Sequence, residues 1–309
     1  MKAFDIYGIG LGDDRPLKKE LICTFTGHQK GVTCLDFNVL YDKRLLVSGS
    51  SDKCIIFWDI LSGESINRIT CSTEIWDLQL LNSTTMGSAG QSGVDLWDLT
   101  SNTKLKCYSN CHQGAVYAIT HDKKMVHEQC FATGGFDGAV RIWDMRIDSV
   151  HGPTLHYIDM QSSINEVEFQ GNHLITGNGG GIVDVYDVRY LDQSRKLYSL
   201  NLSSSGAIRG LRFDGLKIVS GSSSGAIKLT DAQSGRFINH MMHNALQEFK
   251  SSQMTGLDCN ENVLMTSSMG GHVSVFDFTN FVDAVTEDET TDSLATIVSR
   301  PSDRSCSLQ

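Results

Sequence analysis

Short apolar runs and turn-forming residues alternate along most of the chain with a fixed spacing. Six strand-like runs end with a dipeptide whose second residue is Asp. The first residue of the dipeptide is aromatic in five of the six cases: Trp58, Trp97, Trp143, Tyr186, Thr230 and Phe276. These positions stand 39 to 46 residues apart. A regular spacing of this length indicates one supersecondary unit that is repeated six times.

Each unit also contains a predicted β-hairpin and an inner strand. Ten residues before the six positions lie Ser48, Gly87, Thr133, Thr176, Ser220 and Thr266. They belong to short β-rich runs, such as 45–50 and 217–222, that are followed by a Gly/Ser/Asp turn and a second run, which is typical of a hairpin. Further upstream an apolar-x-x-apolar pair predicts the innermost strand: Val32/Leu35, Ile75/Leu78, Val116/Ile119, Ile164/Val167, Ile208/Leu211 and Met254/Leu257.

With these features the sequence resembles the WD40-repeat family over residues 17–280. The resemblance implies an all-β fold, a β-propeller of four-stranded blades. In that family a His, a Ser or Thr, an Asp and a Trp form a buried hydrogen-bonded chain across a blade. The resemblance implies this network for His28, Ser48, Asp52 and Trp58, and again for His112, Thr133, Asp137 and Trp143. The other four repeats have Gln91, Gly180, Ser224 and Gly270 in place of the loop Asp, so we expect their blades to depend more on apolar packing.

The number of blades and the two ends of the chain follow less directly. Six repeats predict six blades, with the run 17–26 as an outer strand that closes the last one. Residues 2–6 resemble the third strand of a repeat, however, so residues 1–16 form either an extension or part of an incomplete seventh blade. No convincing pair of strands follows Asn280, and we expect 281–309, which are acidic and rich in Ser and Thr, to be a disordered tail.

Composition excludes several classes of protein. The chain has 36 Asp and Glu against 26 Lys and Arg, a net charge of −10, which opposes a phosphate-binding face, so no nucleic-acid contact is predicted. No apolar run is long enough for a membrane span, and the first residues do not resemble a leader, so we expect a cytoplasmic or nuclear protein. The 29 Gly against 3 Pro fit repeated tight hairpins, because Pro would remove ladder donors.

No motif predicts catalysis, a metal or a cofactor. The nine cysteines are scattered without a Cys-x-x-Cys pair, and the chain has no phosphate loop, no His-Glu-x-x-His and no Gly-x-Ser-x-Gly. The Gly-rich stretch 177–181 runs from one predicted strand into another, without a helix N-terminus to hold an anion. We therefore predict no catalytic residues; an enzyme built on a propeller is the contrasting class.

A binding surface explains the remaining residues better. In the family, the residue after the first apolar position of the inner strand commonly faces the ligand, and one hairpin position reaches the same rim. These positions include large aromatic and Arg side chains, which dominate the energetics of protein interfaces. The candidate partner-binding face is Trp76, Tyr117, Phe136, Asn165, Arg209 and Met269. The alternative is that one or two of them fill the top of the channel.

Two resemblances to ubiquitin-ligase components remain open. The stretch 131–146 looks like the motif by which some WD40 proteins dock onto the cullin-4 ligase adaptor, which implies docking roles for Arg146 and, by position, Arg189. The short inner connections are similar to those of F-box WD40 receptors, but about twenty residues before the first repeat are too few for an F-box bundle. We therefore predict a non-catalytic scaffold that binds proteins or peptides, in a multi-protein complex; the alternative is a substrate receptor of a cullin-4 type ligase.

Overall fold

The computed structural model describes residues 2–7, 18–38, 45–122, 129–147, 155–158, 162–189, 196–202, 206–242, 253–259, 263–268 and 273–277. The described elements are all β-strands, joined by turns. The chain divides into two compact units, Met1–Ile164 and Asn165–Gln309. The predicted tail, 281–309, lies outside the described residues.

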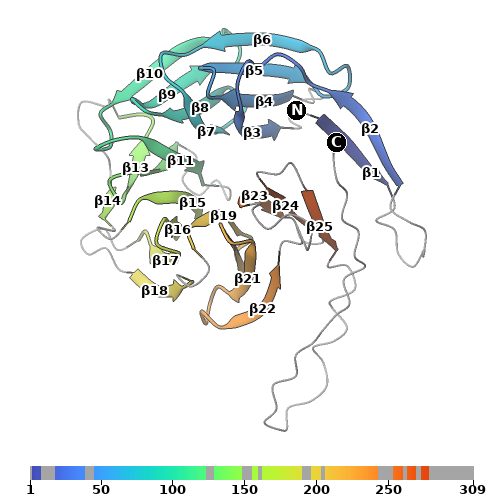
Figure 1. Ribbon diagram of the computed structural model, residues 1–309. Coiled ribbons are helices and arrows are strands. Elements are labelled where there is room, and N and C mark those ends of the chain that lie inside the picture. Colours follow the sequence, from blue (N-terminus) through green and yellow to red (C-terminus); the bar gives the residue numbers. More distant parts are fainter. Residues whose placement is uncertain are drawn as a thin grey trace. The chain divides into compact units, whose positions relative to one another are not determined.

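The first unit contains three four-stranded antiparallel sheets and one two-stranded sheet (Figure 1). The small sheet pairs β1 (Lys2–Tyr7) with β2 (Lys18–Thr24). The first repeat is β3 (Val32–Asn38), β4 (Leu45–Ser50), β5 (Cys54–Asp59) and β6 (Ser65–Thr70). The second is β7 (Ile75–Leu80), β8 (Thr85–Gly90), β9 (Gly93–Asp98) and β10 (Thr103–Ser109). The third is β11 (Val116–His121), β12 (Cys130–Gly135), β13 (Ala139–Asp144) and β14 (Leu155–Ile158).

The second unit contains the other three repeats in the same order of strands (Figure 1). The fourth repeat is β15 (Ile164–Gln170), whose first residue belongs to the first unit, β16 (His173–Asn178), β17 (Ile182–Asp187) and β18 (Lys196–Asn201). The fifth is β19 (Ile208–Phe213), β20 (Lys217–Ser222), β21 (Ala226–Asp231) and β22 (Phe237–Met242). The sixth has three described strands, β23 (Met254–Cys259), β24 (Val263–Ser268) and β25 (Val273–Asp277). The period of the sequence therefore corresponds to one sheet per repeat, and the fold is that of WD40 propeller blades.

The core lies between consecutive sheets. Val47 and Ile55 of the first repeat form one buried cluster with Ile75 and Leu78 of the second. Gly49 shows how close the sheets come, because a Cβ there would meet the side chains of Ile75 and Leu78 at 2.7 and 3.0 Å. The apolar pair of β7 therefore packs on the preceding repeat, and burial of this kind is the main driving force for stacking the sheets within a unit.

The N-terminal strands bear on the two arrangements that the sequence left open. Among the described strands β2 pairs with β1, as expected if both belong to an incomplete further blade. The β1–β2 register shifts between Ala3 and Phe4, as the β5–β6 register shifts between Phe57 and Trp58. The same irregularity precedes Tyr186 and Thr230 in their sheets. By this register, β1 and β2 have the geometry of the third and fourth strands of a further repeat.

Candidate functional site

The inner strands contain a β-bulge at the positions that the sequence singled out. In the second repeat Ile75 pairs with Gly90 and Asp77 with Ala89, so Trp76 is the extra residue. The same reading of the register makes Tyr117 and Arg209 extra residues. A bulge redirects the side chain of the extra residue. The bulge therefore explains why large side chains at these positions project from the sheet.

Two polar residues at this position link neighbouring strands. Thr33 donates its hydroxyl hydrogen bond to the Ile75 carbonyl oxygen, at 2.6 Å. Asn165 donates from Nδ2 to the Ile208 carbonyl oxygen, at 3.1 Å. In both cases the acceptor is the first residue of the next repeat's inner strand. The Asn165 amide, which the sequence assigned to the partner-binding face, thus also holds β19 in place.

Three aromatic side chains of the first unit form a continuous row. The ring centres of Trp76 and Tyr117 lie 5.9 Å apart at 85°, and those of Tyr117 and Phe136 lie 6.5 Å apart at 84°. These are edge-to-face contacts, a favourable arrangement for aromatic pairs. Trp76 is 37% and Phe136 is 61% exposed. We call Trp76, Tyr117 and Phe136 the aromatic row.

Hydrogen bonds from backbone N–H groups fix the strands that carry the aromatic row. The Asp77 carboxylate, next to Trp76, accepts the Ile119 N–H at 2.8 Å and so ties β7 to β11. The Phe136 N–H donates to the Ala115 carbonyl oxygen at 2.9 Å. The backbone that carries the aromatic row is therefore fixed by these hydrogen bonds.

The other predicted members of the face are not part of this row as described. Arg209 is an exposed residue of the second unit. Met269 lies outside the described residues. The structure therefore brings together three of the six predicted residues, all from the second and third repeats.

The first repeat contains a connected set of buried polar side chains. The Ser48 hydroxyl accepts a hydrogen bond from Trp58 Nε1 at 2.8 Å and lies 2.8 Å from His28 Nε2. His28 Nδ1 lies 3.0 Å from an Asp52 carboxylate oxygen. Burial raises the pKa of Asp52, but the Gln29 N–H and His28 lower it by more, to about 2. Asp52 therefore stays charged and orients the histidine.

The third repeat has the same arrangement with one more charged group. Thr133 accepts from Trp143 Nε1 at 2.9 Å, and His112 lies 2.8 Å from both Thr133 and Asp137. Arg141 donates from Nη1 to Asp137 at 2.9 Å, a contact that the sequence analysis did not include. Burial raises the pKa of Asp137, but these hydrogen bonds lower it by more, so the net shift is downward.

The second repeat corrects the predicted position of its hydroxyl. The spacing of ten residues pointed to Gly87, but Trp97 Nε1 donates to Ser88 at 2.9 Å. The turn between β8 and β9 has two residues, whereas that between β4 and β5 has three. The shorter turn moves the hydroxyl one residue closer in sequence and leaves the strand register unchanged: Met86 faces Trp97 as Leu46 faces Trp58.

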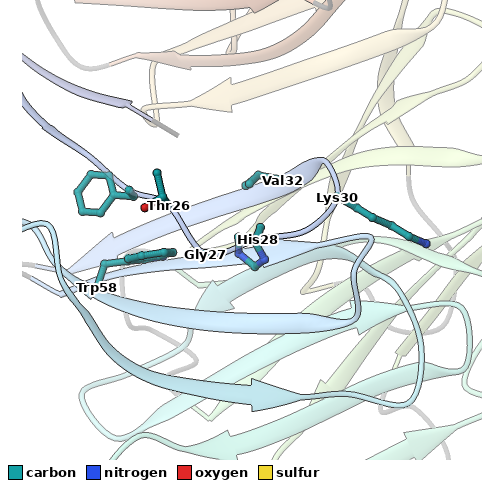
Figure 2. Close-up of a pocket in the computed structure, with 7 residues that line it drawn as sticks. Thr26, Gly27, His28, Lys30, Val32 and Trp58 are labelled. Atoms are coloured by element: carbon teal, nitrogen blue, oxygen red, sulfur yellow. The ribbon is translucent and has the colours of Figure 1, made fainter.

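A small cavity of about 220 Å³ lies beside the first network. Figure 2 shows Trp58, Gly27 and His28 along one side of it, with Thr26 and Val32 above them in that view. Both ring nitrogens of His28 already have partners in the network. Elsewhere in the described residues, no group of three His, Cys, Asp or Glu is placed to hold a metal ion.

A charged chain across three inner strands of the second unit was not foreseen. Arg212 donates from Nη1 to Glu168 and from Nε to Asp258, both at 2.8 Å. The three residues lie four positions after the first apolar residue of β15, β19 and β23. The sequence could have indicated this chain through that shared position, because charges of alternating sign at one position of successive repeats predict ion pairs between neighbouring blades.

The two predicted docking arginines have the same geometry. Arg146 contacts the Asp144 carboxylate through Nε and Nη2, at 2.9 and 2.5 Å. Arg189 contacts Asp187 at 3.0 and 2.6 Å. Both side chains are largely exposed. In each case the Asp that ends the third strand holds the guanidinium, with room for an outside group to approach.

These features define a repeat protein of stacked four-stranded antiparallel blades with a hydrogen-bonded Trp at the end of the third strand. Residues 19–59 and 103–144 match the family model described as WD domain, G-beta repeat. These two segments are WD40 repeats, and proteins built from such repeats are typically protein-interaction scaffolds. No helix of the described residues is long and apolar enough to span a membrane.

Individual relatives agree with this family. The chain is 28% identical to the F-box/WD-40 repeat-containing protein At5g21040 of Arabidopsis thaliana over 58% of its length and 32% of the relative's. It is 23% identical to Protein tipD of Dictyostelium discoideum over 83% of its length and 41% of the relative's. The chain thus spans about a third to two fifths of these proteins. The crystal structure of the computationally designed Ika8 protein matches with a TM-score of 0.63 and 26% identity, over 84% of this chain and 74% of that one.

Proposed function

We propose that the chain is a non-catalytic scaffold that binds another protein or a peptide through the aromatic row. The observation that supports this is the exposure of Trp76 and Phe136 on either side of Tyr117. Bulges redirect Trp76 and Tyr117, and Phe136 lies in the turn between β12 and β13. Packing of the inner strand in the core does not require large aromatic side chains at these positions. Large exposed aromatic residues on a rigid backbone are the common anchors of protein interfaces.

The expected contribution of these rings to binding follows from how far a partner would bury them. Trp and Tyr residues at the centre of an interface typically cost about 2 kcal/mol or more when truncated. A loss of about 1.4 kcal/mol corresponds to a tenfold weaker complex. The row also offers few charges, so a partner would meet it with an apolar or aromatic side chain.

Removing two rings of the row tests this proposal. We expect Trp76→Ala/Phe136→Ala to weaken binding of at least one partner about tenfold or more. The measurement is quantitative affinity enrichment from cells, followed by titration of the purified partner. Leu61→Ala, at an exposed apolar residue in the turn after β5, is the matched control and should bind as wild type. Retention of every partner by a double variant with a wild-type circular dichroism spectrum would contradict the proposal.

A second candidate function is a substrate receptor of a cullin-4 type ubiquitin ligase. One observation favours it: the equivalent, exposed arginines at 146 and 189. Under this proposal, the arginines dock the adaptor while the aromatic row binds the substrate.

Adaptor binding separates the two functions. We expect Arg146→Ala to reduce recovery of the ligase adaptor about tenfold, because a charged hydrogen bond across an interface is lost. Partners bound through the aromatic row should be recovered as from wild type. Equal adaptor recovery with both proteins, or none with either, would argue against the receptor function.

A further inference from the structure

The inner strand of the first repeat exposes an apolar face that is buried in the other repeats. Val32, Leu35 and Phe37 of β3 are 37%, 51% and 60% exposed. The residues equivalent to Val32 and Leu35 in the five other repeats are at most 6% exposed: Ile75, Leu78, Val116, Ile119, Ile164, Val167, Ile208, Leu211, Met254 and Leu257. We call Val32, Leu35 and Phe37 the open face.

The other repeats show what covers this face. A Cβ at Gly49 would meet Ile75 and Leu78, and one at Gly221 would meet Met254 and Leu257. Within each unit, the cover is thus the second strand of the preceding repeat, with a small residue at the point of contact. All six second strands have a small residue there: Gly49, Ala89, Gly134, Gly177, Gly221 and Ser267.

The strands that precede β3 are half of such a repeat. The β1–β2 register has the bulge of a third and a fourth strand. A short link leads from Thr24 to Val32, as one leads from Thr70 to Ile75 between the first two repeats. Among the described strands β1 pairs with β2 alone, so its other edge is where a second strand would add. Within the described residues, the open face and the second edge of β1 therefore lack the same two strands.

We propose that a partner protein completes this repeat by inserting a β-hairpin. One strand of the hairpin pairs with β1. The side chains of both hairpin strands cover the open face. By comparison with the other repeats, the hairpin has two strands of about six residues with apolar side chains toward β3 and Gly, Ala or Ser opposite Leu35. Strand addition of this kind draws affinity from main-chain hydrogen bonds and specificity from the side-chain pockets.

The remaining sequence of this chain suits the position less well. After Asp277, the run Ile297-Val298-Ser299 matches Ile218-Val219-Ser220 of a second strand. It is followed by Arg300 and Pro301, where the second strands have small residues. Arg does not fit the close contact, and Pro removes a ladder donor.

A photocrosslinker on the open face identifies the occupant. In the full chain, Phe37 is replaced by p-benzoylphenylalanine, the protein is irradiated in cells, and the crosslinked peptides are sequenced. We expect a crosslink to another polypeptide, in a strand with the apolar and small residues described above. A crosslink within the same chain, a crosslink to a second copy, or none at all from folded protein would overturn the proposal.

Direct binding then tests the face itself. The probe is the crosslinked hairpin as a synthetic peptide, titrated against the purified full chain. We expect Leu35→Lys/Phe37→Lys to weaken its binding at least tenfold, and the peptide to slow hydrogen exchange of the β1 amides. The control Leu61→Lys also adds charge at an exposed leucine and should leave binding unchanged. Equal binding by the two variants, or exchange in β1 that the peptide does not alter, would contradict the proposal.

Discussion

Asp137→Ala is expected to lower the free energy of unfolding of the first unit by about 3–5 kcal/mol. Asp137 binds His112 at 2.8 Å and Arg141 at 2.9 Å, and the side chains of both partners are largely buried, 0% and 12% exposed. Removing the carboxylate leaves the guanidinium without this ion pair and the imidazole without its orienting acceptor. Unpaired buried groups cost more than the net contribution of the contact itself.

Tryptophan fluorescence during urea unfolding measures this change, because all four tryptophans lie in the first unit. The control is Gln91→Ala, at the equivalent loop position of the second repeat, which lacks the carboxylate network. Gln91 is exposed, so its replacement should alter the free energy of unfolding by less than about 0.5 kcal/mol. Similar destabilisation by the two variants would show that the network adds no specific stability.

Much of the fold was predictable because its period is visible in single residues. A dipeptide that ends in Asp, with an aromatic first residue in five of six cases, ends the third strand of each repeat, and the apolar pairs lie in the first strand. The residues of the His28 and His112 networks could be named from the resemblance, and the structure places them within 2.8 to 3.1 Å of one another. Local patterns of this kind survive in sequence because each repeat needs the same side chain at the same strand position.

Other features depend on geometry that spacing does not record. Ser88 was missed because the turn before β9 is one residue shorter, so a constant count from Trp97 selected Gly87. The pairing of β2 with β1 was one of two alternatives, because an outer strand gives no sign of its neighbour in sequence. Both features depend on strand register, which turn length and pairing decide together.

The candidate site, too, was predictable from the sequence only in part. The bulge positions were predictable, but the edge-to-face contacts of Trp76, Tyr117 and Phe136 join different strands and could not be read from one repeat. Thr33 and Asn165 occupy the same position as Trp76 yet link strands instead. Whether a bulge residue projects or links is decided by its chemistry and by the carbonyl group within its reach.

The charged chain of the second unit gives a second large effect. Arg212→Ala is expected to destabilise that unit by about 3–5 kcal/mol, because Glu168 is only 2% exposed and would lose the ion pair with Arg212. Burial lowers the pKa of Arg212, but the carboxylates of Glu168 and Asp258 raise it by more, so the guanidinium remains charged. Asp258→Ala should cost less than about 1 kcal/mol, because that carboxylate is 57% exposed and water replaces the arginine.

Hydrogen exchange followed by mass spectrometry is the suitable measurement, since the second unit contains no tryptophan. Peptides that cover β19 should exchange much faster in Arg212→Ala and nearly as in wild type in Asp258→Ala. Arg212→Met/Glu168→Gln removes both charges and should recover most of the lost protection, because the main cost is a buried carboxylate charge without the arginine's positive charge beside it. If the double variant exchanged as fast as Arg212→Ala, the packing of the arginine stem would be the dominant contribution instead.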